Sequence, residues 1–177
     1  MKTRTEIVLI VLKYLALLGG IGFSLECGAQ ILSFVASFIN PVWAERTYLA
    51  DPIWFQILDY DPGFYTVLMI LIIAASALKA WVWFLIFELL HKLQLKSPFS
   101  FFVTKRLELI SYMLLAVWFV MTFMAKSYAH YLQKASDIIL PGKYISDEYF
   151  FVAGIVFILS QLFKRGMEMQ EENQLTV

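Results

Sequence analysis

The sequence predicts an all-α membrane protein in which four transmembrane helices form a bundle. Of its 177 residues, 60% are hydrophobic and only 16% are charged, which is a larger apolar share than a soluble domain can bury. The apolar residues are gathered in four long runs, and about 20 mostly apolar residues are enough for one helical crossing of a bilayer. The predicted transmembrane helices are residues 7–38, 63–90, 107–128 and 149–165.

The basic residues between the runs predict the orientation of the chain, because lysine and arginine in short loops are retained on the cytoplasmic side of a membrane. They concentrate before the first run, between the second and third, and after the fourth, at Lys2, Arg4, Lys92, Lys96, Lys105, Arg106, Lys164 and Arg165. The opposite side has Arg46, Lys134 and Lys143, with Lys126 at the boundary. We therefore expect one membrane domain over residues 1–177 with both termini cytoplasmic, outer loops at 39–62 and 129–148, an inner loop at 91–106 and a cytoplasmic tail at 166–177.

The first run is longer than a bilayer requires. As one helix, residues 7–38 would extend about 48 Å, so we expect this helix to tilt or to protrude on the outer side before Pro41 ends it. A small residue recurs at every fourth position, at Gly20, Ser24 and Gly28. Because small side chains let a neighbouring helix backbone approach closely, this stripe predicts a packing face, either inside one chain or between the protomers of a homo-oligomer.

Two loops carry further local signals. The first outer loop is rich in aromatic residues, which fits anchors at the level of the lipid head groups or a ligand-sensing cap. These residues are Trp43, Tyr48, Trp54, Phe55 and Tyr60. In the inner loop, Ser97 followed by Pro98 predicts the N-cap and the first residue of a short amphipathic helix. Its aromatic residues would rest on the membrane surface, at Phe99, Phe101 and Phe102.

Three ionisable residues lie inside the runs, where a charge is costly and indicates a functional role: Glu26, Lys79 and Lys126. Counting about 1.5 Å per residue from the inner helix ends places Glu26 and Lys126 at a similar depth near the outer interface, with Lys79 closer to the inner face. Glu26 and Lys126 could form an ion pair that sets helix register, extend separately to the head groups, or belong to an ion or proton pathway. Lys79 could extend toward the inner head groups or bind an anionic lipid.

The sequence offers little for catalysis. His91 and His130 are expected at opposite membrane faces, so they could not ligate one metal ion or haem together. Cys27 is the single cysteine, which excludes an intrachain disulfide. We find no glycine-rich phosphate loop and no His-Glu-x-x-His motif. The formal net charge is zero, which gives no electrostatic footprint for nucleic acid. We therefore expect no enzyme activity, no cofactor, no metal and no direct contact with nucleic acid.

The C-terminal stretch and the inner loop resemble a known family. The ending runs from Phe163 through Gly166 and Met169 to Glu171-Glu172 and Leu175-Thr176-Val177, and the inner loop has Pro98-Phe99 ahead of Lys105-Arg106. In this pattern the chain is similar to the bacterial membrane proteins grouped as domain-of-unknown-function family 2975, which usually have leucine where this chain has Met169. The resemblance covers the four-helix layout and both cytoplasmic elements. It implies that both termini are inside and implies no established enzyme activity.

The resemblance also implies a partner, because genes of this family often neighbour a gene for a small helix-turn-helix regulator. It favours a bacterial inner-membrane protein that binds or sequesters such a regulator. The docking surface on this hypothesis comprises Pro98, Phe99, Lys105, Arg106, Gly166, Glu168, Glu171, Glu172 and Leu175. The acidic tail residues could equally form an ordinary solvated helix face. Two alternatives stand beside it. One is a small transporter, channel or immunity-type factor that uses the intramembrane charges, and the other is a structural helper that uses the small-residue stripe.

Overall fold

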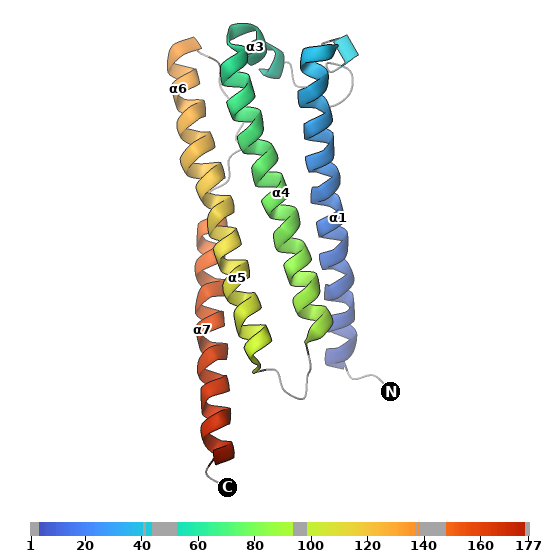
Figure 1. The fold of residues 1–177 in the computed structure, drawn as a ribbon, viewed down its shortest axis with the longest axis vertical. Helices are drawn as coiled ribbons and strands as arrows, with labels where there is room; N and C mark the ends of the chain where they lie inside the picture. Colours follow the sequence, from blue (N-terminus) through green and yellow to red (C-terminus); the bar gives the residue numbers. More distant parts are fainter. Residues whose placement is uncertain are drawn as a thin grey trace.

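The computed structural model describes residues 4–40, 42–43, 53–93, 99–136, 138 and 148–175. Residues 173–175 are described by their backbone alone. Long helices run side by side along one axis (Figure 1). They are α1 (Arg4–Ile39), α4 (Pro62–Lys92), the successive segments α5 (Phe101–Trp118), η1 (Phe119–Ala125) and α6 (Lys126–Ser136), and α7 (Glu148–Leu175). A short helix, α3 (Ile53–Tyr60), precedes α4.

Four of these helices are long and apolar enough to cross a membrane: Arg4–Ile39, Pro62–Lys92, Phe101–Ser136 and Glu148–Glu172. The predicted all-helical fold with four such helices is therefore confirmed. The third is longer at both ends than the predicted 107–128, because α5 continues through a π-helical segment, η1, into α6. The last continues to Leu175, so most of the predicted tail is helical. The first predicted outer loop contains α3, and the second begins with the final turns of α6.

Two polar residues determine where α4 and α5 begin. The carboxylate of Asp61 accepts hydrogen bonds from the backbone N–H groups of Gly63 at 2.7 Å and Phe64 at 3.3 Å, and Pro62 occupies the first turn. At α5 the N-cap is Ser100, whose hydroxyl accepts from the Val103 N–H at 3.4 Å. The helix therefore begins three residues later than the predicted cap at Ser97, which itself lies outside the described residues. Phe101 and Phe102 form its first turn.

α4 lies between the other long helices. It packs against α1 on one side and against α5 and η1 on the other, while α7 packs along α5. At the end of the bundle where α4 begins, α3 closes the core with Trp54, which is 1% exposed and packs edge-on against Tyr65 at 6.4 Å between ring centroids. Trp54 is thus a core residue and not an anchor at the lipid head groups, because α3 folds back over α4. The Tyr65 hydroxyl also lies 2.7 Å from the Ser37 hydroxyl, which joins α1 to this core.

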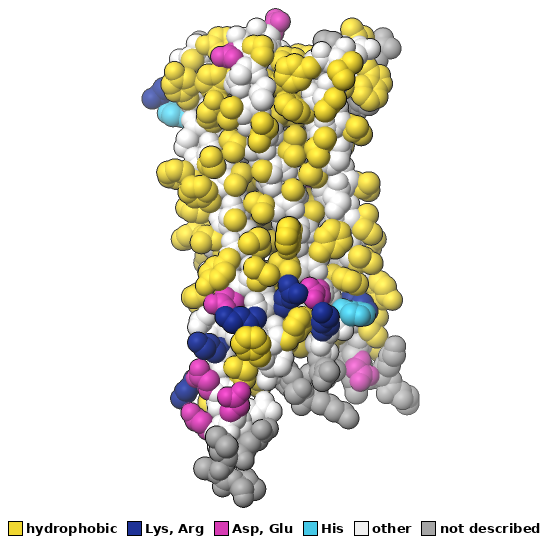
Figure 2. Space-filling view, in the orientation of Figure 1, with side chains coloured by type: hydrophobic (Ala, Val, Ile, Leu, Met, Phe, Trp, Pro, Cys, Tyr) yellow, Lys and Arg dark blue, Asp and Glu magenta, His cyan; other side chains and the backbone are white. Residues whose placement is uncertain are grey.

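Charged side chains form a band near the end of the bundle where α1 begins and α7 ends (Figure 2). We call this the charged end. Lys13 of α1 lies 5.7 Å from the ring centroid of Phe87 on α4, so the first turns of α1 extend along this end. The N-terminal start of α1 and the C-terminal end of α7 lie at the same end of the bundle (Figure 1).

The start of α7 lies about midway along the bundle (Figure 1). Phe150 packs on Trp118 at 4.9 Å between ring centroids, and Phe163 packs on Phe99 at 5.2 Å, so α7 runs antiparallel to α5 from the beginning of η1 to beyond the start of α5. The sixteen helical steps from Glu148 to Lys164 rise about 24 Å, which is less than the thickness of a bilayer core of about 30 Å. Glu148 begins helix α7 and does not end the loop 129–148 that the sequence predicted.

Candidate functional site

The charged end is organised by Glu88 on α4. Its carboxylate forms salt bridges with Lys92, one turn later on the same helix, and with Arg106 on α5, each at 2.8 Å. All three side chains are partly exposed, so these pairs contribute modestly to stability and mainly align the ends of α4 and α5. Arg106, predicted for partner docking, is thus already neutralised within the chain.

The inner loop and the C-terminal helix touch each other. The ring of Phe99 packs on Phe163, and it also lies against the backbone of Gly166, where an added Cβ would be 2.7 Å from Phe99 Cδ1. We call this the loop–tail contact. It brings together two of the residues predicted for partner docking, Phe99 and Gly166, which are far apart in the sequence. A glycine is needed at position 166 because the aromatic ring occupies the space of a side chain.

The remaining predicted docking residues lie around the loop–tail contact or beyond it. Lys105 pairs with Glu108 at 2.8 Å, and Glu168 pairs with Arg165 at 3.1 Å. Glu171 and Glu172 are exposed on the last turns of α7. Pro98 and the side chain of Leu175 lie outside the described part of the chain. The structure therefore gathers most of the predicted surface at one end of the molecule, with its lysines and arginines in internal ion pairs.

Lys79 lies in the interior of α4 and is half-buried. Its ammonium is 5.8 Å from the ring centroid of Phe23 on α1 and 5.4 Å from that of Tyr149 on α7, close enough for cation–π attraction. Glu26 is three residues after Phe23 on α1, which places it on the neighbouring turn of the same helix face. The contact with Phe23 therefore places Glu26 near the level of Lys79, whereas the count along the helices put Glu26 nearer to the outer interface. Within the described chain, the ammonium has no hydrogen-bonded or ion-paired acceptor.

The other two intramembrane charges are separated from each other. The Glu26 carboxylate accepts a hydrogen bond from the side-chain amide of Gln30 at 3.2 Å, one turn later on α1. Lys126 begins α6, which lies on the opposite side of α4 from α1 (Figure 1), and its side chain is exposed. Glu26 and Lys126 are therefore not neighbours, although the sequence predicted a similar depth for both, because α4 lies between α1 and α6. Glu26 is instead nearer to Lys79, because Phe23, one turn before Glu26 on α1, contacts the Lys79 ammonium.

A cavity of about 480 Å³ lies between α1, α4, α5 and α7. Lys79 and Glu148 carry charge among the described residues that line it, and the others are aliphatic or aromatic. Lys79 lies with Phe23 and Tyr149 toward the interior of the bundle, and Glu148 precedes Tyr149 on α7, whereas Leu89 lies near the charged end. We call it the Lys79 cavity. Its volume falls in the range of about 300–1,000 Å³ that is typical of small-molecule sites.

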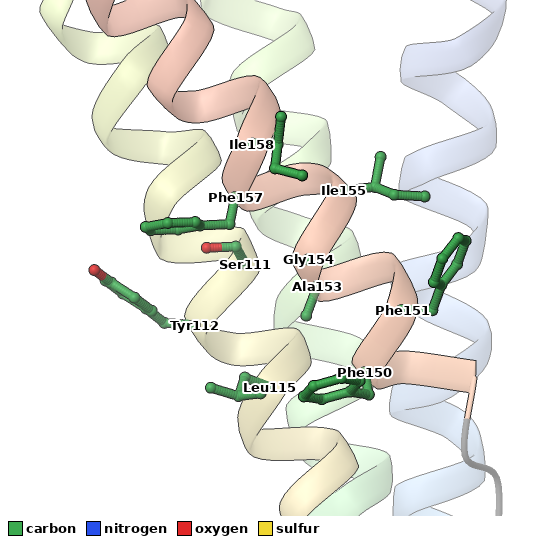
Figure 3. A pocket seen from close by; sticks show the side chains of 10 residues that line it. All are labelled: Ser111, Tyr112, Leu115, Phe150, Phe151, Ala153, Gly154, Ile155, Phe157 and Ile158. Carbon is green, nitrogen blue, oxygen red and sulfur yellow. The ribbon is translucent and has the colours of Figure 1, made fainter.

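A second hollow, of about 440 Å³, opens on the outer face where α7 packs on α5 (Figure 3). Phe150 and Phe157 of α7 lie toward α5, where Tyr112 and Leu115 complete the wall, and Phe151 points away from it. Ser111 contributes a hydroxyl, but it donates to the Glu108 carbonyl at 2.7 Å. This surface is largely apolar and fits contact with acyl chains, and its Tyr112 hydroxyl donates to the Glu108 carboxylate at 3.2 Å.

The small-residue stripe divides into two parts. Gly20 is buried against Phe84 of α4, and an added Cβ would be 2.9 Å from that ring. Its neighbour Gly19 is equally close to Trp83, at 2.7 Å. Ser24 is exposed and donates to the Gly20 carbonyl at 2.8 Å, while a Cβ at Gly28 would meet nothing within 4 Å. The close helix approach inside the chain therefore rests on Gly19 and Gly20, of which the stripe predicted only the second.

Sequence reasoning missed Glu148, Tyr149 and Lys13. Hydropathy placed Glu148 in an outer loop, and nothing in a linear pattern indicates that α7 begins so deep in the bundle. Lys13 interrupts the first run and could have shown that the helix begins in a polar environment. In the described ranges, no group of three His, Cys, Asp or Glu residues is placed to hold a metal ion.

Comparison with known proteins identifies a family. Searches of curated proteins and of solved structures gave no match. One family model does match the chain, over residues 36–177, which includes α4, α5, α6 and α7 but leaves out most of α1. The residues of the loop–tail contact lie inside the matched region. The match covers most of the sequence, and the chain therefore belongs to the family described as Protein of unknown function (DUF2975).

Proposed function

We propose that this chain is a non-enzymatic protein of the bacterial inner membrane, with both termini cytoplasmic, that binds and sequesters a small helix-turn-helix transcription regulator. The charged end would face the cytoplasm, because it carries Arg106, Lys164 and Arg165 beside the start of α1 and the end of α7. The start of α1 and the end of α7 both lie at this end, which supports a common side for the two.

The loop–tail contact is the observation that carries the proposal. Phe99 holds α7 at Gly166, beyond which the helix continues to Leu175 past the ends of the other long helices (Figure 1). Residues 166–177 contain three glutamates and no lysine or arginine. An acidic helix directed away from the bundle offers a surface of the sign that a basic DNA-binding domain would recognise. Occupying that basic face would keep the regulator away from DNA.

The experiment is affinity purification of the tagged protein from its native membrane, with mass spectrometry of the proteins that accompany it. The tested variants are deletion of residues 168–177 and the double substitution Glu171→Lys with Glu172→Lys. The matched control is Lys134→Glu with Gln133→Glu, which changes charge on exposed residues of α6 at the other end of the bundle. A helix-turn-helix protein recovered with the parent and the control, but not with the tail variants, is the expected result. Equal recovery from all four chains, or none from the parent, would contradict the proposal.

A small transporter or channel is a second candidate, and the position of Glu26 favours it, one turn from the Phe23 ring that contacts the Lys79 ammonium. On this proposal the charges inside the membrane are essential and the tail is dispensable. Glu26→Gln and Lys79→Met would abolish uptake or conductance in reconstituted vesicles, whereas deletion of residues 168–177 would leave it unchanged. The reverse pattern, together with partner recovery, favours sequestration.

A further inference from the structure

The Lys79 cavity has a polar group at an unusual depth. Lys79 precedes Glu88 by nine residues on α4, which places it about 14 Å from the charged end. This is near the middle of a bilayer core of about 30 Å. A phospholipid keeps its charged head group at the interface, so it would present only its acyl chains at this level. A ligand whose own polar group lies at Lys79 must therefore be a lipid whose polar group is uncharged.

The ammonium of Lys79 has no hydrogen-bond acceptor among the described residues. It has three N–H donors, and among the described residues its close contacts are the faces of two aromatic rings. Desolvating an ammonium without hydrogen bonds is costly, so a ligand oxygen at this position would be bound strongly. Tyr149 adds a phenolic hydroxyl to the same lining. The site is therefore suited to a carbonyl oxygen.

The charges around Lys79 disfavour an anionic ligand. Glu26 is one turn from the Phe23 ring that contacts the Lys79 ammonium, and Glu148 lines the same cavity. A fatty-acid carboxylate would add a third negative charge beside a single cation in a medium of low dielectric constant, where such repulsion is strong. This argues against the anionic lipid that the sequence suggested for Lys79.

The walls beside Lys79 are aromatic. Phe23, Trp83 and Tyr149 line the cavity, and Trp83 is one helical turn from Lys79 on α4, toward the charged end. Flat side chains of this kind stack on planar rings. From Trp83 onward the lining is mainly aliphatic as far as Leu89, which suits a hydrocarbon tail. The π-helical segment η1 begins next to the start of α7, and such segments occur frequently at functional sites.

We propose that the Lys79 cavity binds an uncharged lipid with a planar, carbonyl-bearing ring, that is, a membrane quinone. Lys79 donates a hydrogen bond to a ring carbonyl, Phe23, Trp83 and Tyr149 enclose the ring, and the tail lies between α4, α5 and α7 toward the charged end. Because α1 packs on α4 and α7 packs on α5, the side between α1 and α7 is the route of entry from the bilayer. This binding does not depend on the proposed capture of a regulator.

Tryptophan fluorescence tests the proposal, because quinones quench it and Trp83 lines the cavity. The full chain in lipid nanodiscs is titrated with decylubiquinone, a benzoquinone with a decyl tail. Trp81 is two residues away and 60% exposed on the outside of α4, so Trp81→Phe is the matched control for Trp83→Phe. We expect saturable quenching that persists in Trp81→Phe and is largely lost in Trp83→Phe. Quenching that rises linearly and equally in both variants would show partitioning into lipid only and would overturn the proposal.

Substitutions at Lys79 test the hydrogen bond. Lys79→Met should weaken the apparent affinity for decylubiquinone about tenfold to a hundredfold, since hydrogen bonds to charged groups are the stronger ones. Lys79→Arg, which keeps the charge and the donors, should restore most of it, and Tyr149→Phe should have an effect of about threefold. The melting temperature of each variant in nanodiscs separates lost binding from lost folding. Unchanged affinity in a folded Lys79→Met would overturn the assignment of Lys79.

A series of decyl compounds tests the head group while the tail stays constant. Decanoate, decanol and decyltrimethylammonium are each added as competitors of decylubiquinone. We expect none of them to displace the quinone at equal concentration, because they lack a planar ring with carbonyl acceptors. Displacement by decanoate would show that the site takes an anionic amphiphile, and displacement by decyltrimethylammonium would show that it takes a cation. Either result would contradict the proposal.

Discussion

Phe99 lies directly against the backbone of Gly166, so that a Cβ on Gly166 would come within 2.7 Å of Phe99 Cδ1. This contact couples the inner loop to the C-terminal helix at the level of the charged end. Gly154 lies on the same helix, but an added Cβ there would meet nothing within 4 Å. The two glycines therefore provide a matched pair for testing whether the loop–tail contact determines where the last part of α7 points.

Gly166→Ala should loosen the end of α7. Overpacking costs about 1–3 kcal/mol, and alanine recovers about 0.5–1 kcal/mol through its better helix propensity. We expect faster proteolysis of the residues after position 166 and a slightly lower melting temperature. Gly154→Ala should show neither change.

The same contact can be checked by a double-mutant cycle. Phe99→Ala removes the ring that an alanine at position 166 would meet. In that background Gly166→Ala should cost nothing and could stabilise the helix. Additive effects of the two substitutions would show that Phe99 and Gly166 do not interact.

Ser37 and Tyr65 should respond unequally to removal of their hydroxyls. The Ser37 hydroxyl lies 2.7 Å from the Tyr65 hydroxyl and donates to the Ser33 carbonyl at 2.7 Å. Tyr65→Phe leaves Ser37 with that carbonyl, whereas Ser37→Ala leaves the buried Tyr65 hydroxyl without a partner. We expect Ser37→Ala to cost about 1–3 kcal/mol and Tyr65→Phe about 0.5–1.5 kcal/mol, measured by reversible unfolding in mixed micelles. Equal costs would mean that a water replaces the missing serine.

Gly20 and Gly28 should differ although both belong to the predicted stripe. An alanine at position 20 would press on Phe84, while an alanine at position 28 would enter open space. Gly20→Ala is therefore expected to lower the melting temperature in detergent by several degrees, and Gly28→Ala to leave it unchanged or higher. If Gly28→Ala instead dissociates an oligomer in crosslinking experiments, position 28 packs between protomers.

The orientation can be measured by cysteine labelling in intact cells. In a Cys27→Ala background, Lys134→Cys should react with a membrane-impermeant maleimide, because Lys134 is exposed near the end of the bundle away from the charged end. Lys92→Cys, also exposed but at the charged end, should react only after the cells are permeabilised. The opposite pattern would place the charged end outside and would also rule out capture of a cytoplasmic regulator.

The apolar runs alone were enough to predict four membrane helices, because the ability of a segment to span a bilayer depends on the length and hydropathy of that segment itself. Capping residues also indicate where helices begin, although the N-cap of α5 is Ser100 and not the predicted Ser97. Hydropathy contains no information on how far one helix is shifted along another or how it is rotated. Those quantities follow from packing, such as Gly19 on Trp83 and Phe150 on Trp118. Only the tertiary structure could therefore place Glu26, Glu148 and Tyr149 around Lys79, bury Trp54, and bring Phe99 against Gly166.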